Sequence, residues 1–260
     1  MKNILFALAF LVSGAVVAES ESDFWLGFDV DPSRPAIDHS AWAEILSSRS
    51  NNNPHADWRH RFNPADFSKK EKKALKKYIE SMQEIDPRYY SYDDQLAYWL
   101  NLYNALTVSF MVDAKDFNDV RHHHDKPLLE IAGKRFSQRY IANTILYPVW
   151  NDLSLHFLLS CAAVDCPPLP ERAFSAGSAH PLSKPAMDAY INGPQGWRLE
   201  GGTLYLPRAM EHFSTYFDSQ AAMIKRLAFA VPQDKALKLL GHSGPVVYSD
   251  HTALASATAP

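Results

Sequence analysis

The chain has 260 residues, of which 47% are hydrophobic and 12% aromatic, and this is enough to build a full hydrophobic core. Its formal net charge is −3, and it has no basic block beyond residues 69–77. Because binding to phosphate backbones needs a concentrated basic surface, we expect no nucleic-acid partner.

Residues 1–18 have the pattern of a secretory signal peptide. Lys2 supplies a positive charge, residues 4–12 form a short apolar core, and Val16, Val17 and Ala18 offer small residues for cleavage. The apolar run is short for a membrane span, and no later segment reaches about 18 apolar residues. We therefore expect a secreted or periplasmic protein without an integral membrane span after signal removal. A retained anchor is the alternative.

Residues 19–61 are predicted to be an N-terminal extension that wraps the main domain. Trp25, Phe28 and Trp42 are its apolar anchors, and residues 41–46 favour a short helix. The main domain is expected over residues 62–250, followed by a flexible tail at 251–260, where Ala, Ser and Thr occur without periodicity.

Two helices are predicted in the first half of the main domain. Ser68 and Glu71 form a capping box before a run with apolar residues at helical spacing, and Pro87 ends that run. Ser91 opens a second helix, which is apolar on nearly all sides. Its interior polar residues, Asn101, Asn104 and Thr107, lie on one face, and buried amides need partners. Those partners are backbone groups, a polar cluster or a ligand, and backbone is favoured.

The remaining segments predict further short elements. They are an extended stretch at 128–131 with a turn at 133–134, a helix at 137–147, a surface loop at 172–185, a helix at 186–191, a β-hairpin at 197–206, a helix from Pro207, and helices at about 220–230 and 232–241. This order predicts a helix-rich single domain of the α+β class with a small, partly antiparallel sheet.

The rare residue types gather between Asp152 and Leu169. This stretch holds both cysteines of the chain, Cys161 and Cys166, with His156 five residues before the first and two prolines directly after the second. Residues 153–159 could form a buried strand that presents His156.

Three segments together resemble the uncharacterised family 547 among the domains of unknown function (DUF 547). They are residues 98–107 (YWLNLYNALT), residues 133–137 (GKRFS) and residues 156–168, a pattern of His, four residues, Cys, four residues and Cys-Pro-Pro. The resemblance extends over about residues 62–248. It implies fold and family membership, because the family has no settled activity. Its organisation is distantly similar to papain-like and transglutaminase-like hydrolases.

The chain departs from the family pattern at several polar positions. Ala142 and Asn143 stand where the family usually has an acidic residue and a histidine, and Ser160 stands where it usually has Asn. The closing family motif is degraded here between Tyr248 and Ala255. If those positions form a working constellation in the family, this chain has lost part of it.

Four hypotheses fit the central stretch. A Cys161–Cys166 disulfide is favoured by the even cysteine count and by the oxidising compartment in which a secreted or periplasmic protein would fold. From the loop entropy it would add about 2 kcal/mol to the free energy of unfolding. Alternatively, Cys161 is a nucleophile with His156 as base, and Asn101 or Asn104 orients the imidazole or stabilises an oxyanion. A strand would place His156 and Cys161 on opposite faces, so that pair needs a bend.

The third hypothesis is a metal site of His156, Cys161 and Cys166 with His122, His123, His124 or His180, but the spacing matches no standard zinc pattern. The fourth is plain structure, with buried free thiols and a core histidine. We therefore expect neither cofactor nor metal. The leading hypothesis is a binding or scaffold module with a polar pocket where Asn101 and Asn104 meet His156 and Cys161. The alternative is a thiol-dependent hydrolase or acyl transferase. Substrate, partner and oligomeric state are left open.

Overall fold

The computed structural model describes residues 21–26, 30–31, 33–52, 63–163, 166–207 and 209–249. The predicted signal peptide (1–18) and the predicted tail (251–260) lie outside these residues. The first half of the described chain contains α1 (Glu21–Trp25), α2 (Ser40–Asn52), η1 (Pro64–Asp66), α4 (Lys69–Gln83), η2 (Pro87–Tyr89), α5 (Tyr92–Asp113), α6 (Phe117–His124), β1 (Leu129–Ile131) and β2 (Lys134–Phe136).

The second half begins with three consecutive helical segments, α7 (Gln138–Tyr140), the π-helix η3 (Ile141–Leu146) and α8 (Tyr147–Trp150). These are followed by η4 (Leu153–Leu158), α9 (Ala179–Asn192), β3 (Arg198–Glu200), β4 (Thr203–Pro207), α10 (Ala209–Ser214), α11 (Gln220–Ala228), α12 (Gln233–Leu240) and β5 (Val246–Ser249). The fold is helix-rich α+β.

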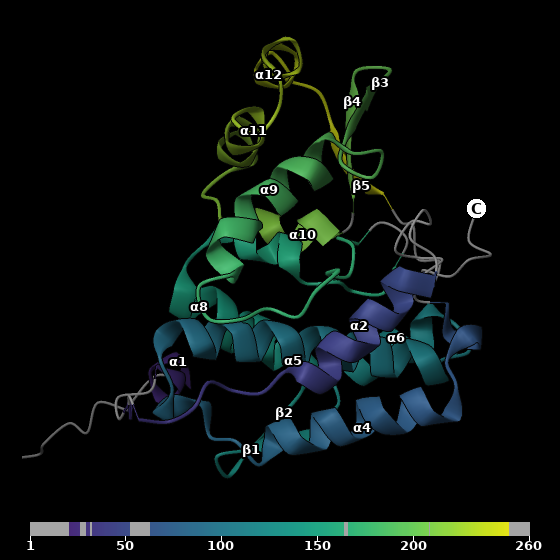
Figure 1. Cartoon of the computed structure of the whole chain (residues 1–260). Helices are drawn as coiled ribbons and strands as arrows, with labels where there is room; N and C mark the ends of the chain where they lie inside the picture. Colours follow the sequence, from purple (N-terminus) through teal and green to yellow (C-terminus); the bar gives the residue numbers. More distant parts are fainter. Residues whose placement is uncertain are drawn as a thin grey trace, which may run out of the picture.

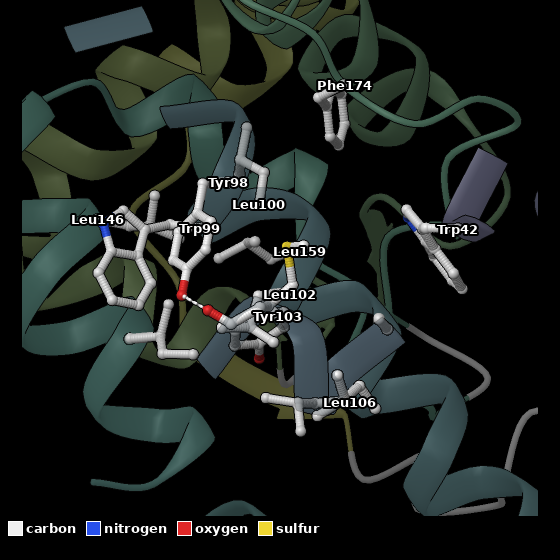
Figure 2. Close-up of a cluster of buried hydrophobic side chains, with 14 of the residues drawn as sticks. Trp42, Tyr98, Trp99, Leu100, Leu102, Tyr103, Leu106, Leu146, Leu159 and Phe174 are labelled. Carbon is white, nitrogen blue, oxygen red and sulfur yellow. Dashed lines mark hydrogen bonds between the residues drawn. The ribbon is translucent and has the colours of Figure 1, made fainter. Parts of the chain in front are cut away.

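Helix α5 is the centre of the fold. Figure 1 shows it crossing the middle of the molecule, with α4 and the β1–β2 hairpin on one side and α9, α10 and the β3–β5 sheet on the other. Ser91 caps it by accepting a hydrogen bond from the backbone N–H of Asp94, as the sequence predicts. Sixteen of its 22 residues are buried, including Tyr98, Trp99 and Leu100, which Figure 2 shows among the surrounding apolar side chains. Polar groups inside α5 therefore need protein partners or a ligand.

Helix α4 confirms the predicted capping box. The Ser68 hydroxyl accepts from the N–H of Glu71, and the Glu71 carboxylate accepts from the N–H of Ser68. Four apolar residues face inward, namely Leu75, Tyr78, Ile79 and Met82. The hydroxyl of Tyr98 on α5 donates to the carbonyl of Met82 at 2.7 Å, and this bond joins the two helices.

The structure contains two small sheets where the sequence predicted one. β1 and β2 form an antiparallel hairpin, with positive φ at Ala132 and Gly133 in its turn. β3 and β4 form the hairpin predicted at 197–206, but β5 then pairs with β4 in parallel, so this sheet is mixed. The pairing of β5 was not predicted because it joins segments about 40 residues apart.

The strand predicted around His156 is wrong. Residues 153–158 form a short 3₁₀ helix, η4, whose start is fixed by the carboxylate of Asp152 accepting from the N–H of Ser154 at 2.9 Å. The run lacks the alternation of apolar and polar residues that is typical of a half-buried strand. The Asp152 cap stabilises a helical turn in place of the strand.

The loop predicted at 172–185 is also wrong in its second half, because α9 already begins at Ala179. Pro181 lies in its first turn, where a missing N–H has no cost, and Pro185 is tolerated inside the helix. The helix predicted from Pro207 starts after it, since Pro207 ends β4.

Two hydrophobic clusters make up the core. The larger surrounds α5 and includes Trp25, Trp42 and Leu159. The smaller combines η4, α9, β4 and α10–α12, with Phe157, Tyr190 and Phe213 among its members. Leu155 and Leu158 of η4 belong to the larger cluster and Phe157 to the smaller one, so η4 lies between the two.

Candidate functional site

The two cysteines of the central stretch form a disulfide. The Cα atoms of Cys161 and Cys166 lie 5.5 Å apart, within the usual range for a disulfide. Cys166 is 2% exposed and its N–H donates to the carbonyl of Ala163 at 3.1 Å, whereas Cys161 is half-buried. The predicted disulfide is confirmed, and it closes a tight loop directly after η4.

The polar face of α5 holds the backbone that leads into this loop. The Nδ2 of Asn104 donates to the carbonyl of Leu158 at 2.9 Å, and its Oδ1 accepts from the N–H of Ser160 at 3.0 Å. Thr107 donates to the carbonyl of Ser160 at 2.9 Å. The side chain of Asn104 therefore fixes both residues that flank Leu159, whose side chain packs against α5 (Figure 2).

Asn101 holds a second loop in the same way. Its Nδ2 donates to the carbonyl of Phe174 at 2.8 Å, and its Oδ1 accepts from the N–H of the same residue at 2.9 Å. Asn101 and Asn104 are both fully buried. The expectation that these amides bind backbone is confirmed.

A cavity of about 200 Å³ lies beside the disulfide, where the two hydrophobic clusters meet. Tyr103, Ala142, Tyr147 and Leu159 line it from the larger cluster, and Phe157, Tyr190, Met210 and Phe213 from the smaller one. Cys161 and Pro167 lie at the loop side, and the polar residues of the lining are His124, Arg139, Asn143 and His156. A mostly apolar wall with several aromatic rings and a few polar groups is typical of small-molecule sites.

Aromatic rings enclose the imidazole of His156. The ring of Tyr147 stacks on it with the centroids 3.5 Å apart, and Phe213 and Tyr216 approach it edge-on at 5.7 and 5.0 Å. These contacts come from α8, α10 and the segment after it, so three parts of the chain fix the orientation of the imidazole.

The π-helix η3 forms one side of the cavity through Ala142 and Asn143. A π-helix has hydrogen bonds between residues five apart, in place of the four of an α-helix. The N–H of Tyr147 accordingly donates to the carbonyl of Ala142. Pro148 follows and has no N–H to continue an α-helical pattern. π-Helical turns occur often at functional sites, so this feature agrees with the position of the cavity.

The structure brings together only part of the predicted site. His156 and Cys161 line the same cavity, whereas Asn101 and Asn104 lie behind its wall and contact backbone. The roles predicted for these four residues in catalysis stay predictions. Sequence reasoning missed Tyr103, Arg139 and Tyr190, which lie on three different helices.

The histidines considered for a metal site are dispersed. His124 lines the cavity, and Nδ1 of His180 lies 3.7 Å from the carboxylate of Asp152. Within the part of the chain that the structure describes, no three His, Cys, Asp or Glu side chains gather as metal ligands would. In the same part of the chain, no helix is long and apolar enough to span a membrane.

Comparison with known families identifies the centre of the chain. Residues 87–191 match the family model described as protein of unknown function, DUF547. The chain carries a DUF547 domain. The match covers α5, the hairpin, η3, η4, the disulfide loop and α9, and thus a shorter part than the predicted resemblance over 62–248. Neither a curated protein nor a solved structure gives a match to this chain.

The DUF547 domain supplies most of the cavity, and Met210 and Phe213 complete it from outside the matched region. Ala142 and Asn143, two of the positions where this chain departs from the family pattern, both line the cavity. These two departures from the family pattern therefore fall on the site itself.

Proposed function

We propose that this protein is a ligand-binding module whose cavity takes a small, ring-sized molecule. The observation that carries the proposal is the aromatic cavity of about 200 Å³ at the junction of the two hydrophobic clusters. A cavity of about 150 Å³ lined by apolar side chains is known to hold benzene, so this one has room for one substituted ring.

The loop beside the cavity is fixed in a way that suits binding. Asn104 and Thr107 hold the backbone before Cys161, and the disulfide to Cys166 closes the loop after it. A rigid wall loses little conformational freedom when a ligand binds, which favours affinity.

Two observations favour binding over catalysis. Cys161 is in a disulfide and therefore has no thiolate, which is the nucleophilic form of cysteine. Ala142 and Asn143 supply neither the carboxylate nor the imidazole that the family usually has at these cavity-lining positions.

Filling the cavity tests the proposal. Ala142→Phe places a ring into the space, while Ala41→Phe on an exposed position of α2 is the matched control. We expect ring-sized fragments to bind the wild-type protein and Ala41→Phe in ligand-observed NMR, and to lose at least tenfold in affinity for Ala142→Phe. Thermal unfolding checks that both variants fold. Fragments that bind Ala142→Phe as well as wild type, or no binding to any protein, would contradict the proposal.

A thiol-dependent hydrolase or acyl transferase is the second candidate. The observation in its favour is that His156 and Cys161 line one cavity. On reduction of the disulfide, Cys161 would be the nucleophile and His156 the base. The distant resemblance to papain-like and transglutaminase-like hydrolases belongs to this candidate, as do oxyanion or imidazole contacts from Asn101 or Asn104, which now bind backbone.

Alkylation of the thiols separates the two candidates. We expect iodoacetamide to label neither cysteine in the native protein at pH 6, and to label Cys161 only slowly after a dithiol reductant is added, since an ordinary thiol with a pKa near 8.5 is protonated at pH 6. Mass spectrometry locates the label, and Cys161→Ser is the control. Rapid labelling of Cys161 at pH 6 would favour the enzyme.

We further propose that the protein is exported to an oxidising compartment through the signal-like residues 1–18. The disulfide supports this placement, because structural disulfides persist in secreted and periplasmic proteins and are rare in the cytosol.

A further inference from the structure

Three polar side chains from three helices lie along one part of the cavity wall. They are Tyr103 from α5, His124 from the last turn of α6, and Arg139 from α7. Tyr103 and His124 are only 8% and 9% exposed. The proposed binding function does not yet assign these groups a role.

One of these groups is buried without a hydrogen-bond partner in the protein. Among the described residues, Nε2 of His124 is buried and has no hydrogen-bond partner. The hydroxyl of Tyr103 is not one of these buried atoms, and no hydrogen bond to it is found in the same part of the chain, whereas the Tyr103 carbonyl accepts from Gln138. A buried polar group without a partner costs free energy, so such a group in a cavity wall favours a ligand that carries polar atoms.

Arg139 retains donors that its own ion pair does not use. Its Nε and Nη2 donate to the two oxygens of Asp125, the second at 3.3 Å. A guanidinium has five N–H groups, so three are left for another acceptor. Asp125 is 61% exposed in its side chain and is not part of the cavity wall, whereas Arg139 is.

The electrostatics of the wall agree with this placement of Arg139. Burial raises the pKa of Tyr103 to about 12, and the positive charge of Arg139 acts in the opposite direction. Burial lowers the pKa of His124 to about 4, with the charge of Arg139 as the next cause. Arg139 is thus close enough to influence both groups, and at neutral pH Tyr103 keeps its donating hydroxyl and His124 is uncharged.

A second group of lining residues is aromatic. Phe157 and Phe213 lie with their ring centroids 5.7 Å apart, and Tyr190 lies 5.4 Å from Phe157. Together with the volume of about 200 Å³, these rings favour a flat apolar body. The cavity wall therefore combines a group of hydrogen-bond donors with a group of aromatic rings.

We propose that the cavity selects a small aromatic carboxylate. Its ring lies against Phe157 and Phe213, and its carboxylate accepts from the guanidinium of Arg139 and the hydroxyl of Tyr103. A single negative charge suits the wall better than a phosphate dianion, because Asp125 already offsets part of the charge of Arg139. This inference rests on the proposed binding function and names the ligand class for the same site.

A comparison of benzoate with benzyl alcohol tests the proposed ligand class, because the two compounds have the same ring and a similar size but differ in charge. We expect calorimetry at pH 7 to give benzoate at least a tenfold lower Kd for the wild-type protein, because charge-assisted hydrogen bonds are about twice as strong as neutral ones. Arg139→Gln is expected to abolish this preference while leaving the Kd of benzyl alcohol within about twofold, which also shows that the variant folds. Arg135→Gln, on the exposed side of β2, is the matched control and keeps the preference.

Tyr103→Phe separates the effect of the hydrogen bond from that of the charge. We expect it to raise the Kd of benzoate about fivefold and to change the Kd of benzyl alcohol little. Equal affinity of the wild-type protein for both compounds would overturn the ligand class, as would an unchanged preference in Arg139→Gln. In either case the comparison of fragment binding to the wild-type protein and Ala142→Phe still decides the binding function. If no ring compound binds the wild-type protein at all, the binding function fails, and this inference fails with it.

Discussion

At the scale of single residues, the amides of α5 show how a buried polar group organises the site. Asn104 is 0% exposed and uses its donor and its acceptor on backbone groups on either side of Leu159, a residue of the cavity wall. Its side chain thus links the centre of the fold to the site without entering the cavity. It was predictable that the amide has hydrogen-bond partners, because a buried amide without partners costs free energy. It was not predictable which backbone groups those partners are.

Replacing Asn104 tests this link. We expect Asn104→Ala to lower the free energy of unfolding by about 2–4 kcal/mol, because it leaves the Leu158 carbonyl and the Ser160 N–H buried without partners. Urea denaturation measures the change, and Asn118→Ala at an exposed position of α6 is expected to stay within about 0.5 kcal/mol. A change in Asn104→Ala no larger than in this control would contradict the role of the amide as a clamp.

At the scale of elements, the sequence predicted those structures whose signals are local. Ser68 with Glu71 and Ser91 with Asp94 mark the starts of α4 and α5, and both caps form as predicted. The 3₁₀ helix around His156 was missed because its signal is one side-chain cap, at Asp152, in a run whose apolar residues also suit a strand. The sequence pattern could not distinguish the two conformations.

Elements that depend on distant partners were harder to predict. The start of α9 was placed too late because Pro181 and Pro185 favour a loop unless tertiary packing supports the helix, and α9 packs closely on η4. Strand β5 exists through its parallel pairing with β4, and nothing within residues 246–249 indicates that partner. The bend that brings His156 and Cys161 to one cavity follows from η4. Because hydrophobic periodicity did not predict η4, it did not predict this bend either.

At the scale of the molecule, the site is a product of how two hydrophobic clusters meet. The cavity takes Tyr103 and Tyr147 from one cluster and Tyr190 and Phe213 from the other, so its lining spans more than 100 positions of the chain. The motif with His156 and Cys161 pointed to one wall only. The other walls are formed where helices pack together. The sequence predicts these helices individually, but it does not predict how they pack against one another.

The segment predicted to be an N-terminal extension takes part in the same core. Trp25 on α1 is 0% exposed, its ring meets those of Trp99 and Phe136 edge-on at 5.1 and 5.4 Å, and its Nε1 donates to the hydroxyl of Tyr140 at 3.2 Å. Tyr140 is the residue directly before the π-helix that forms one side of the cavity. The stability of the whole molecule, and the support of that cavity wall, should therefore depend on α1.

We expect Trp25→Ala to lower the free energy of unfolding by about 3–5 kcal/mol, because it removes a fully buried indole and leaves a cavity among aromatic rings. Phe229→Ala is the matched control, since that ring is 72% exposed, and its effect should be within about 0.5 kcal/mol. Urea denaturation followed by circular dichroism measures both. If the midpoint for Trp25→Ala equals that of the control, α1 does not contribute to the core. A loss of stability that also weakens fragment binding would instead connect α1 to the cavity through Tyr140 and η3.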